Sequence, residues 1–253
     1  MLCKVGAARE LATVSQPNRY VHVDIKESQL SQRAGAMIID FFRMETSALF
    51  RGLAEYHEKM EVQLELIQKK EEEQLRSWAE AEALEPAEFF AELDGHRWTY
   101  DFLFPRSLRY SFIVLLFLVL ESQLGQLCDQ VKNRRNLPVR ASEFRGGVVQ
   151  RAKTYLRKMA GIKDVDWTYV EDLSKIRNCI VHALGKVDLS RDKDRLRHLA
   201  LRGNGLTISD DEFSEEGILL VSADYCSQAV RNVSAFFDEV FDAAGFGPEI
   251  VIL

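Results

Sequence analysis

An arginine, an asparagine and a histidine stand close together near the end of a short amphipathic segment. Arg177 and Asn178 are adjacent, and His182 follows Asn178 by four residues. On a helix, Asn178 and His182 therefore lie one turn apart on one face. A guanidinium can bind phosphate through two parallel hydrogen bonds, and histidine can take up or release a proton near neutral pH. These three side chains are candidates for chemistry at a phosphate group.

The segment that holds them, residues 173–185, has the pattern of a helix with one buried face. Its apolar residues recur at steps of three and four and predict that face: Leu173, Ile176, Ile180, Val181 and Leu184. Gly185 follows as a C-terminal stop signal.

The order of Arg177, the polar Asn178 and then His182 resembles the Arg-x(4–6)-His motif of the HEPN superfamily. Arg51–His57 and Arg191–His198 fit the bare spacing too, but only the Arg177 match lies in an apolar helix that follows a long apolar helix. The resemblance covers about residues 100–245. It implies an all-α domain, and many members are metal-independent ribonucleases of toxin–antitoxin and phage-defence systems.

The resemblance also implies a role for each residue. His182 would be the general base or acid, Arg177 would hold the phosphate, and Asn178 would orient the phosphate or the His182 tautomer. HEPN nucleases dimerise so that two motifs face one cleft, and some members pair with a nucleotidyltransferase. The partners expected are RNA, a second copy, and an antitoxin or nucleotidyltransferase. A non-catalytic HEPN-like module that binds RNA, a nucleotide or a protein is the competing hypothesis.

The residues themselves leave two local alternatives open. Arg177 can instead pair with Asp172 or Glu171, with His182 a structural histidine at the helix end. Glu121 is a carboxylate that follows the most apolar run of the chain, so it needs either a charged partner or access to solvent. Arg177 is a candidate for that partner.

A basic stretch lies between the apolar run and the motif. Residues 132–163 contain ten lysines and arginines against one acid, Glu143, although the whole chain has a formal net charge of −6. Such an asymmetry is typical of nucleic-acid contact. The residues expected to contact RNA are Arg134, Arg135, Arg140, Arg145, Arg151, Lys153, Arg157 and Lys158.

Composition narrows the function classes. The four cysteines show no paired spacing and, with the five histidines, offer no metal cluster. No phosphate-binding glycine loop of the Walker or dinucleotide type appears, so no cofactor is expected. The most apolar run, residues 112–120, is too short to span a bilayer and predicts a buried core helix. We expect a cytoplasmic protein without a membrane role.

The pattern along the chain predicts a mainly α fold: a HEPN-type helical bundle with a long N-terminal helix and a small β-hairpin near the C-terminus. Residues 21–25 alternate like a short strand. Residues 28–84 predict one long helix, whose apolar seam repeats every eleven residues and packs on a partner or folds back on the chain. Residues 96–104 predict a strand or extended segment. A boundary near 95 then separates an N-terminal region, 1–95, from a HEPN-like domain, 96–253.

The second region is expected to contain four helices and the hairpin. A central helix begins at Pro105, and shorter helices follow at 148–159 and at the motif. Residues 205–222 predict the β-hairpin, and 224–241 a final amphipathic helix.

Overall fold

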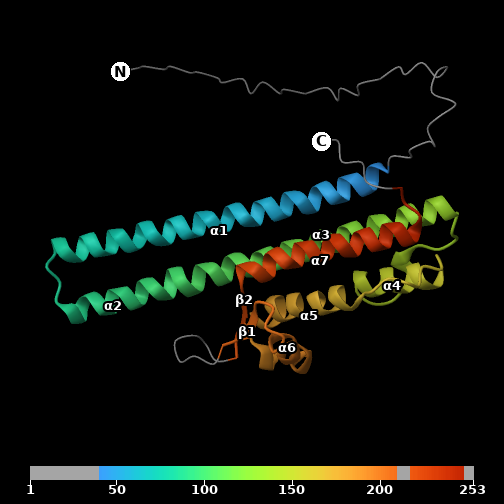
Figure 1. Ribbon diagram of the computed structural model, residues 1–253. Coiled ribbons are helices and arrows are strands. Elements are labelled where there is room, and N and C mark those ends of the chain that lie inside the picture. The colour runs from blue at the N-terminus through green and yellow to red at the C-terminus, as the bar shows by residue number, and fades with distance from the viewer. Residues whose placement is uncertain (1–39, 210–216, 248–253) are drawn as a thin grey trace, which may run out of the picture. The chain divides into compact units, whose positions relative to one another are not determined.

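The computed structural model describes residues 40–209 and 217–247. The fold is mainly α, as expected (Figure 1). The short strand expected at 21–25 and the acidic turn of the hairpin at 210–216 lie outside the described residues.

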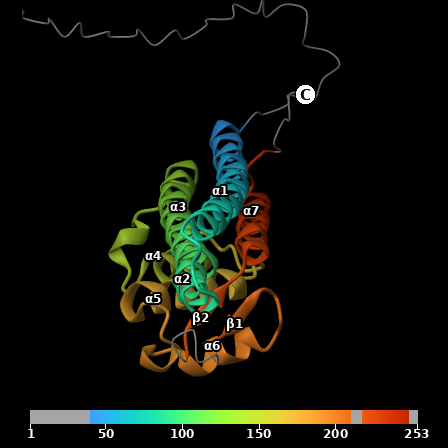
Figure 2. The ribbon, with the colours of Figure 1, turned by 90° about the vertical axis from the view of Figure 1, so that its left-hand side faces the viewer.

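Helix α3 (Phe104–Arg135) is the centre of the core. It contacts α1 (Phe41–Ala81), α4 (Val148–Lys158), α5 (Thr168–Ala183) and α7 (Ala223–Ala244) (Figure 2). Its fully buried residues include Ile113, Leu116, Leu120, Leu124 and Leu127. Neighbours on several sides explain why this run is hydrophobic nearly all round.

The helix that contains α3 runs from Pro86 to Arg135 and is long and apolar enough to cross a membrane by length and composition. Half of its most apolar window is buried inside the protein. Of the run expected to form a buried core helix, residues 112–120, one face is buried, with Phe112 and Phe117 as examples, whereas Leu115 and Leu118 are 38% and 53% exposed.

Within the described residues the long N-terminal helix is present as α1, which continues without interruption through Gly52, whereas residues 28–39 of the expected helix lie outside the described residues. It lies against α3 and α7, so it folds back on its own chain. Leu53 and Leu64 of the predicted seam are buried, whereas Tyr56, Ile67 and Trp78 are each more than two fifths exposed. The eleven-residue repeat therefore overestimates the buried face, because intrachain neighbours cover only part of it.

The segment expected to be extended, residues 96–104, is helical instead. Helix α2 (Pro86–Arg97), the π-helical segment η1 (Trp98–Leu103) and α3 form one continuous helix. Asp94 and Gly95 do not break it. The boundary expected near residue 95 falls inside this helix, and the described residues on both sides belong to one compact unit.

Pro105 accounts for the π-helical segment. Proline has no N–H and crowds the carbonyl of the residue four positions earlier in an α-helix. The chain widens just before it, and the Phe104 N–H bonds to the Thr99 carbonyl, five residues back. The Tyr100 carbonyl would need the N–H of Pro105 to continue this pattern. The Gln68 side-chain amide donates to that carbonyl from α1 instead.

The expected β-hairpin is confirmed. Strands β1 (Leu206–Ile208) and β2 (Leu219–Val221) pair antiparallel, with Leu206 opposite Val221. Tyr110 of α3 donates a hydrogen bond to the Leu219 carbonyl. Gly185, at φ +83°, lies so close to Tyr110 that a Cβ atom would come 2.0 Å from the phenol oxygen. This contact brings the end of α5 against α3.

A buried polar network joins α1, α3 and α7. Arg109 donates to both carboxylate oxygens of Glu61, at 2.9 and 3.0 Å, and His57 Nε2 lies 3.3 Å from Glu61. His57 also lies 3.4 Å from the Ser227 hydroxyl and packs on Phe112. Burial by itself raises the pKa of Glu61, but its contacts with His57 and Arg109 outweigh burial and lower that pKa to about 2.

We predict that Gln68→Ala lowers the free energy of unfolding by about 1 kcal/mol, because the Tyr100 carbonyl loses its donor. Urea unfolding measures this change, and amide hydrogen exchange should show faster opening of residues 98–104. The matched control is Gln63→Ala, since Gln63 is an exposed glutamine of the same helix. Equal effects of the two substitutions would contradict the role of Gln68.

A second prediction concerns pH. The folded pKa of Glu61 lies below its unfolded value of about 4.5, so its stabilisation is present above pH 4.5 and is lost as pH falls toward 2. The loss is on the order of 3 kcal/mol. Urea unfolding between pH 6 and 2 should show a shallower decline for Glu61→Gln. An unchanged slope would rule out this assignment.

Candidate functional site

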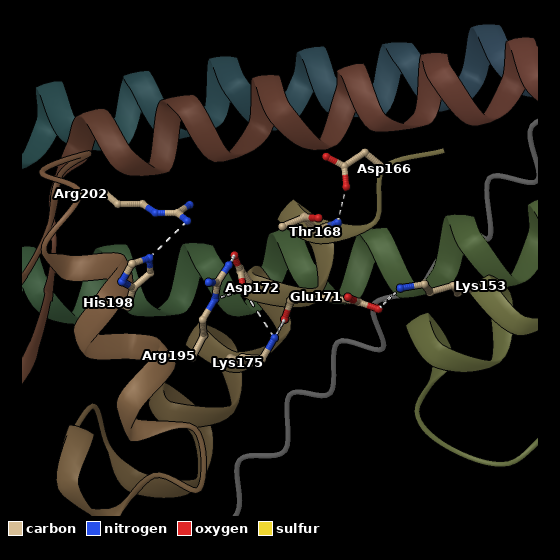
Figure 3. Close-up of polar contacts among 9 residues, drawn as sticks. All are labelled: Lys153, Asp166, Thr168, Glu171, Asp172, Lys175, Arg195, His198 and Arg202. Atoms are coloured by element: carbon tan, nitrogen blue, oxygen red, sulfur yellow. Dashed lines mark hydrogen bonds and ion pairs between the residues drawn. The ribbon is translucent and has the colours of Figure 1, made fainter. Parts of the chain in front are cut away.

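Helix α5 carries the motif, and its first turn is set by Asp166. The Asp166 carboxylate accepts a hydrogen bond from the Thr168 N–H at 2.9 Å, as a helix cap does (Figure 3). Hydrogen bonds from Thr168 lower the pKa of Asp166. Asp166 itself precedes the N-cap residue of α5, which is Trp167.

Ion pairs attach the first half of α5 to its neighbours. Asp172 is buried and accepts two hydrogen bonds, at 2.8 and 2.5 Å, from Arg195 of α6 (Lys193–Ala200) (Figure 3). Burial by itself raises the pKa of Asp172, but Arg195 and then Lys175 lower it. Glu171 pairs with Lys153 of α4. Both carboxylates proposed as alternative partners of Arg177 are therefore engaged elsewhere.

Arg177 pairs with Glu121 across the α5–α3 contact. Its Nη2 lies 3.2 Å from the Glu121 carboxylate, and each side chain is about a fifth exposed. Arg177 Nη1 donates to the Asn178 side-chain oxygen at 2.9 Å. The guanidinium also lies over the Phe117 ring, 4.8 Å from its centre. Glu121 thus has the partner that its charge predicts, and part of the Arg177 hydrogen-bonding capacity remains free.

His182 is exposed one turn beyond Asn178. Both line an open hollow of about 510 Å³ together with Leu189, Ser190 and Arg191. Leu189 belongs to the 3₁₀ turn η3 (Val187–Leu189), which follows α5. Asn178 and His182 therefore face solvent-accessible space, whereas Arg177 is not among the residues that line this hollow.

Two further hollows continue from this one. The second, lined by Asn178, Lys175, Glu121 and the start of α4 at Gly147–Gln150, shares Asn178 and Asp192 with the first. The third shares Glu121 and Val148 with the second and reaches Arg140 and Arg151. We call this connected series the motif groove. It brings together Asn178, His182 and Glu121 with two residues of the basic stretch.

Two residues that the sequence predicts to be buried are exposed. Val181 is 46% and Leu184 is 74% exposed, whereas Leu173, Ile176 and Ile180 are buried as expected. Leu184 ends the helix in the left-handed conformation, at φ 50°, which turns it away from the buried face. Leu189, on the rim of the first hollow, is 72% exposed.

The other two matches to the arginine–histidine spacing have different surroundings. His57 is buried against Phe112 and contacts Glu61, so it cannot reach a substrate. His198 is exposed on α6, where its ring lies 3.5 Å from Arg202 (Figure 3). Its motif partner, Arg191, lines the hollow of His182 instead.

The basic stretch divides into structural and unpaired residues. Arg134 pairs with the buried Asp40 and lies over Phe246, and Arg135 donates to the carbonyls of Ala160 and Ala244. Lys153 holds Glu171. Five of the residues expected to contact RNA form no ion pair with any residue that the structure describes: Arg140, Arg145, Arg151, Arg157 and Lys158. Their role in RNA binding remains a prediction.

Two cations of the groove were not predicted from the sequence. Arg191 lies beside His182 in the first hollow, and Lys175 lies beside Asn178 in the second. Lys175 precedes Asn178 by three residues, a helical spacing that could have indicated it. The sequence position of Arg191 did not indicate that it lines the hollow of His182, because the turn of the chain after α5 brings it to that hollow.

No group of three or more potential metal ligands occurs within residues 40–209 and 217–247. Comparison with known proteins finds no matching family model, curated protein or solved structure.

We predict that Arg177 and Glu121 stabilise the fold jointly. A double-mutant cycle of Arg177→Ala and Glu121→Ala should give a coupling of about 1 kcal/mol in urea unfolding, since the pair is mostly shielded from water. The control cycle uses Lys59 and Glu55, which are 72% and 65% exposed. That exposed pair should couple much more weakly than Arg177 and Glu121. Equal coupling in both cycles would contradict the contact.

Proposed function

We propose that this protein is a metal-independent endoribonuclease of HEPN type that acts as a homodimer in toxin–antitoxin or antiviral defence in the cytoplasm. The observation that carries the proposal is the arrangement around α5. An accessible histidine, His182, shares an open hollow with Asn178, and Asn178 is hydrogen-bonded to Arg177. Neither of the other two arginine–histidine matches has this arrangement.

The proposed reaction needs only groups that these side chains provide. The ribose 2′-oxygen attacks the adjacent phosphorus, and the bond to the 5′-oxygen breaks, which leaves a 2′,3′-cyclic phosphate and a 5′-hydroxyl. A base takes the proton of the 2′-hydroxyl, and an acid gives a proton to the leaving oxygen. His182 fills one of these roles. Guanidinium groups of Arg177 and Arg191 stabilise the added negative charge of the phosphorane.

A second copy would complete this set of groups. One subunit has one motif histidine, whereas the reaction uses both a base and an acid. Three exposed apolar side chains are close to His182. Val181 and Leu184 flank it in the sequence, and Leu189 lines its hollow. An apolar surface of this kind is typical of an interface. Burying it against a second copy would bring two His182 side chains toward one cleft.

The motif groove supports RNA as the substrate. From the hollow of His182 it continues past Asn178 and Glu121 to Arg140 and Arg151. Neither arginine forms an ion pair with a described residue, so both are available for phosphates. We propose that the RNA strand follows this groove from its basic end to the motif.

One observation favours the second candidate, a HEPN-like module that binds RNA, a nucleotide or a protein without cutting. The charge of Arg177 is neutralised by Glu121 within the same subunit. A guanidinium held in this way stabilises the contact between α5 and α3 even without a substrate. An antitoxin or a nucleotidyltransferase would then be the partner that the motif surface binds.

The decisive experiment is the incubation of total RNA and transfer RNA with the purified protein in excess EDTA. The wild type should produce fragments with cyclic-phosphate ends, and His182→Ala should lower the rate by about 10²- to 10⁴-fold. Arg177→Ala should be similarly impaired. The matched control is His198→Ala, another exposed histidine, which should retain full activity. Full activity of His182→Ala would disprove the proposed site.

A folded, dimeric wild type that retains RNA but does not cleave it would favour the binding module. RNA retention itself should fall at least about tenfold in the double variant Arg140→Glu with Arg151→Glu, because phosphate contacts are lost. The control with the same change in net charge is Lys59→Glu with Arg231→Glu, two exposed residues of α1 and α7. Equal retention by both double variants would exclude the groove as the RNA path.

A further inference from the structure

The far part of the α1–α2 pair has almost no buried surface. Between Glu65 and Phe104, Leu93 is the only buried residue. Helix α2 packs on α1, and the shorter body helices pack on α3 further along the chain. Figure 1 shows α1 and α2 side by side beyond the first turn of α7. We call residues 65–104 the hairpin arm. Its exposure is unrelated to the motif groove.

The end of the hairpin arm contains an apolar hollow of about 410 Å³. Side chains from both helices and their connection line it, and its apolar lining consists of Ala79, Ala83, Leu84, Pro86, Phe89 and Phe90. Phe90 is 60% exposed, although it contacts Phe89 at a ring distance of 6.0 Å. A hollow with an exposed aromatic side chain is suited to receive an apolar side chain from another molecule.

Carboxylates are frequent in the segment that forms this hollow. Glu80 lines it, and Glu82, Glu85 and Glu88 are exposed in the turn beside it. None of these four forms an ion pair with a described residue. The one cation of the lining, Arg76, is already bonded to Glu72 at 2.7 Å. The hollow therefore has a mostly apolar lining with one carboxylate, and three more exposed carboxylates are close to the lining in the sequence.

The acidity extends along the hairpin arm. Residues 71–101 contain ten carboxylates and two arginines, a formal charge of −8, whereas the whole chain has −6. The remaining residues together have +2. The negative charge of the protein is thus concentrated in this part of the sequence, where it would attract a cationic partner.

We propose that the end of the hairpin arm binds a basic amphipathic helix of a partner protein. An apolar side chain of that helix would enter the hollow beside Phe90, and its lysines or arginines would pair with Glu80, Glu85 and Glu88. The basic stretch of a second copy fits less well, because the apolar residues of α4, such as Val149 and Leu156, are buried in its own core. An anionic lipid surface would be repelled by the carboxylates.

The test uses a fluorescently labelled amphipathic peptide of leucine and lysine and measures its anisotropy with the full-length protein. Phe90→Ser and, separately, Glu85→Lys with Glu88→Lys should each weaken binding at least about tenfold. A peptide of leucine and glutamate should not bind. Because all three residues are exposed, the variants should fold, which circular dichroism checks.

The matched controls are Leu201→Ser and the double variant Asp194→Lys with Glu58→Lys, all at exposed positions outside the hairpin arm. Both should bind the basic peptide as the wild type does. The proposal would be overturned if the control variants weakened peptide binding as much as the variants of the hairpin arm do. Two other results would also overturn it. In both, the variants of the hairpin arm leave peptide binding unchanged. They abolish either self-association in sedimentation or binding to phosphatidylglycerol vesicles.

Discussion

Burial of α3 on several sides is the constraint on which the rest of the structure depends. One helix supplies the contact surface for α1, α4, α5 and α7, so the positions of all four depend on its side chains. Its fully buried leucines leave no room for polar groups on the inner faces. Polar residues of α3 lie at exposed positions, such as Asp129 and Gln130, or where a neighbour supplies a partner. Glu121 and Arg109 occupy such positions, one facing α5 and the other facing α1.

The pair of Glu121 and Arg177 has two physical consequences. A partly shielded carboxylate is costly without a partner, so Arg177 satisfies Glu121 and ties α5 to α3. The same contact lowers the net positive charge that Arg177 presents to a phosphate. Asn178 and the ring of Phe117 further restrict the guanidinium. A restricted guanidinium loses less conformational freedom on binding an oxyanion, as the proposed ribonuclease reaction would require.

Charge is separated along the sequence. The stretch that includes α4 has ten cations and one acid, and the end of the α1–α2 pair has ten carboxylates and two arginines. Some basic residues form contacts that stabilise the fold, as Arg134 and Arg135 do. The acidic residues near the turn at Glu82 and Glu85 have no such role among the described contacts. Their charge would act on other molecules, while the charge of the basic stretch is divided between fold and surface.

The sequence by itself determined the helical character, the confirmed β-hairpin and the identity of the motif residues. These features depend on local periodicity, capping and turn chemistry, as Asp166 illustrates. The sequence was misleading at Pro105, where it predicts the start of a helix because proline is common in a first turn. The helix instead continues through Pro105, since a π-helical segment and the Gln68 amide compensate for the missing N–H.

Only the tertiary structure decided which of the three motif histidines lines an open hollow and which carboxylate holds Arg177. Burial of His57, exposure of His182 and the approach of Arg191 depend on how distant segments pack. The exposure of Val181 and Leu184 was also decided there. Helical spacing shows which side chains share a face, but only neighbouring elements determine whether that face is covered.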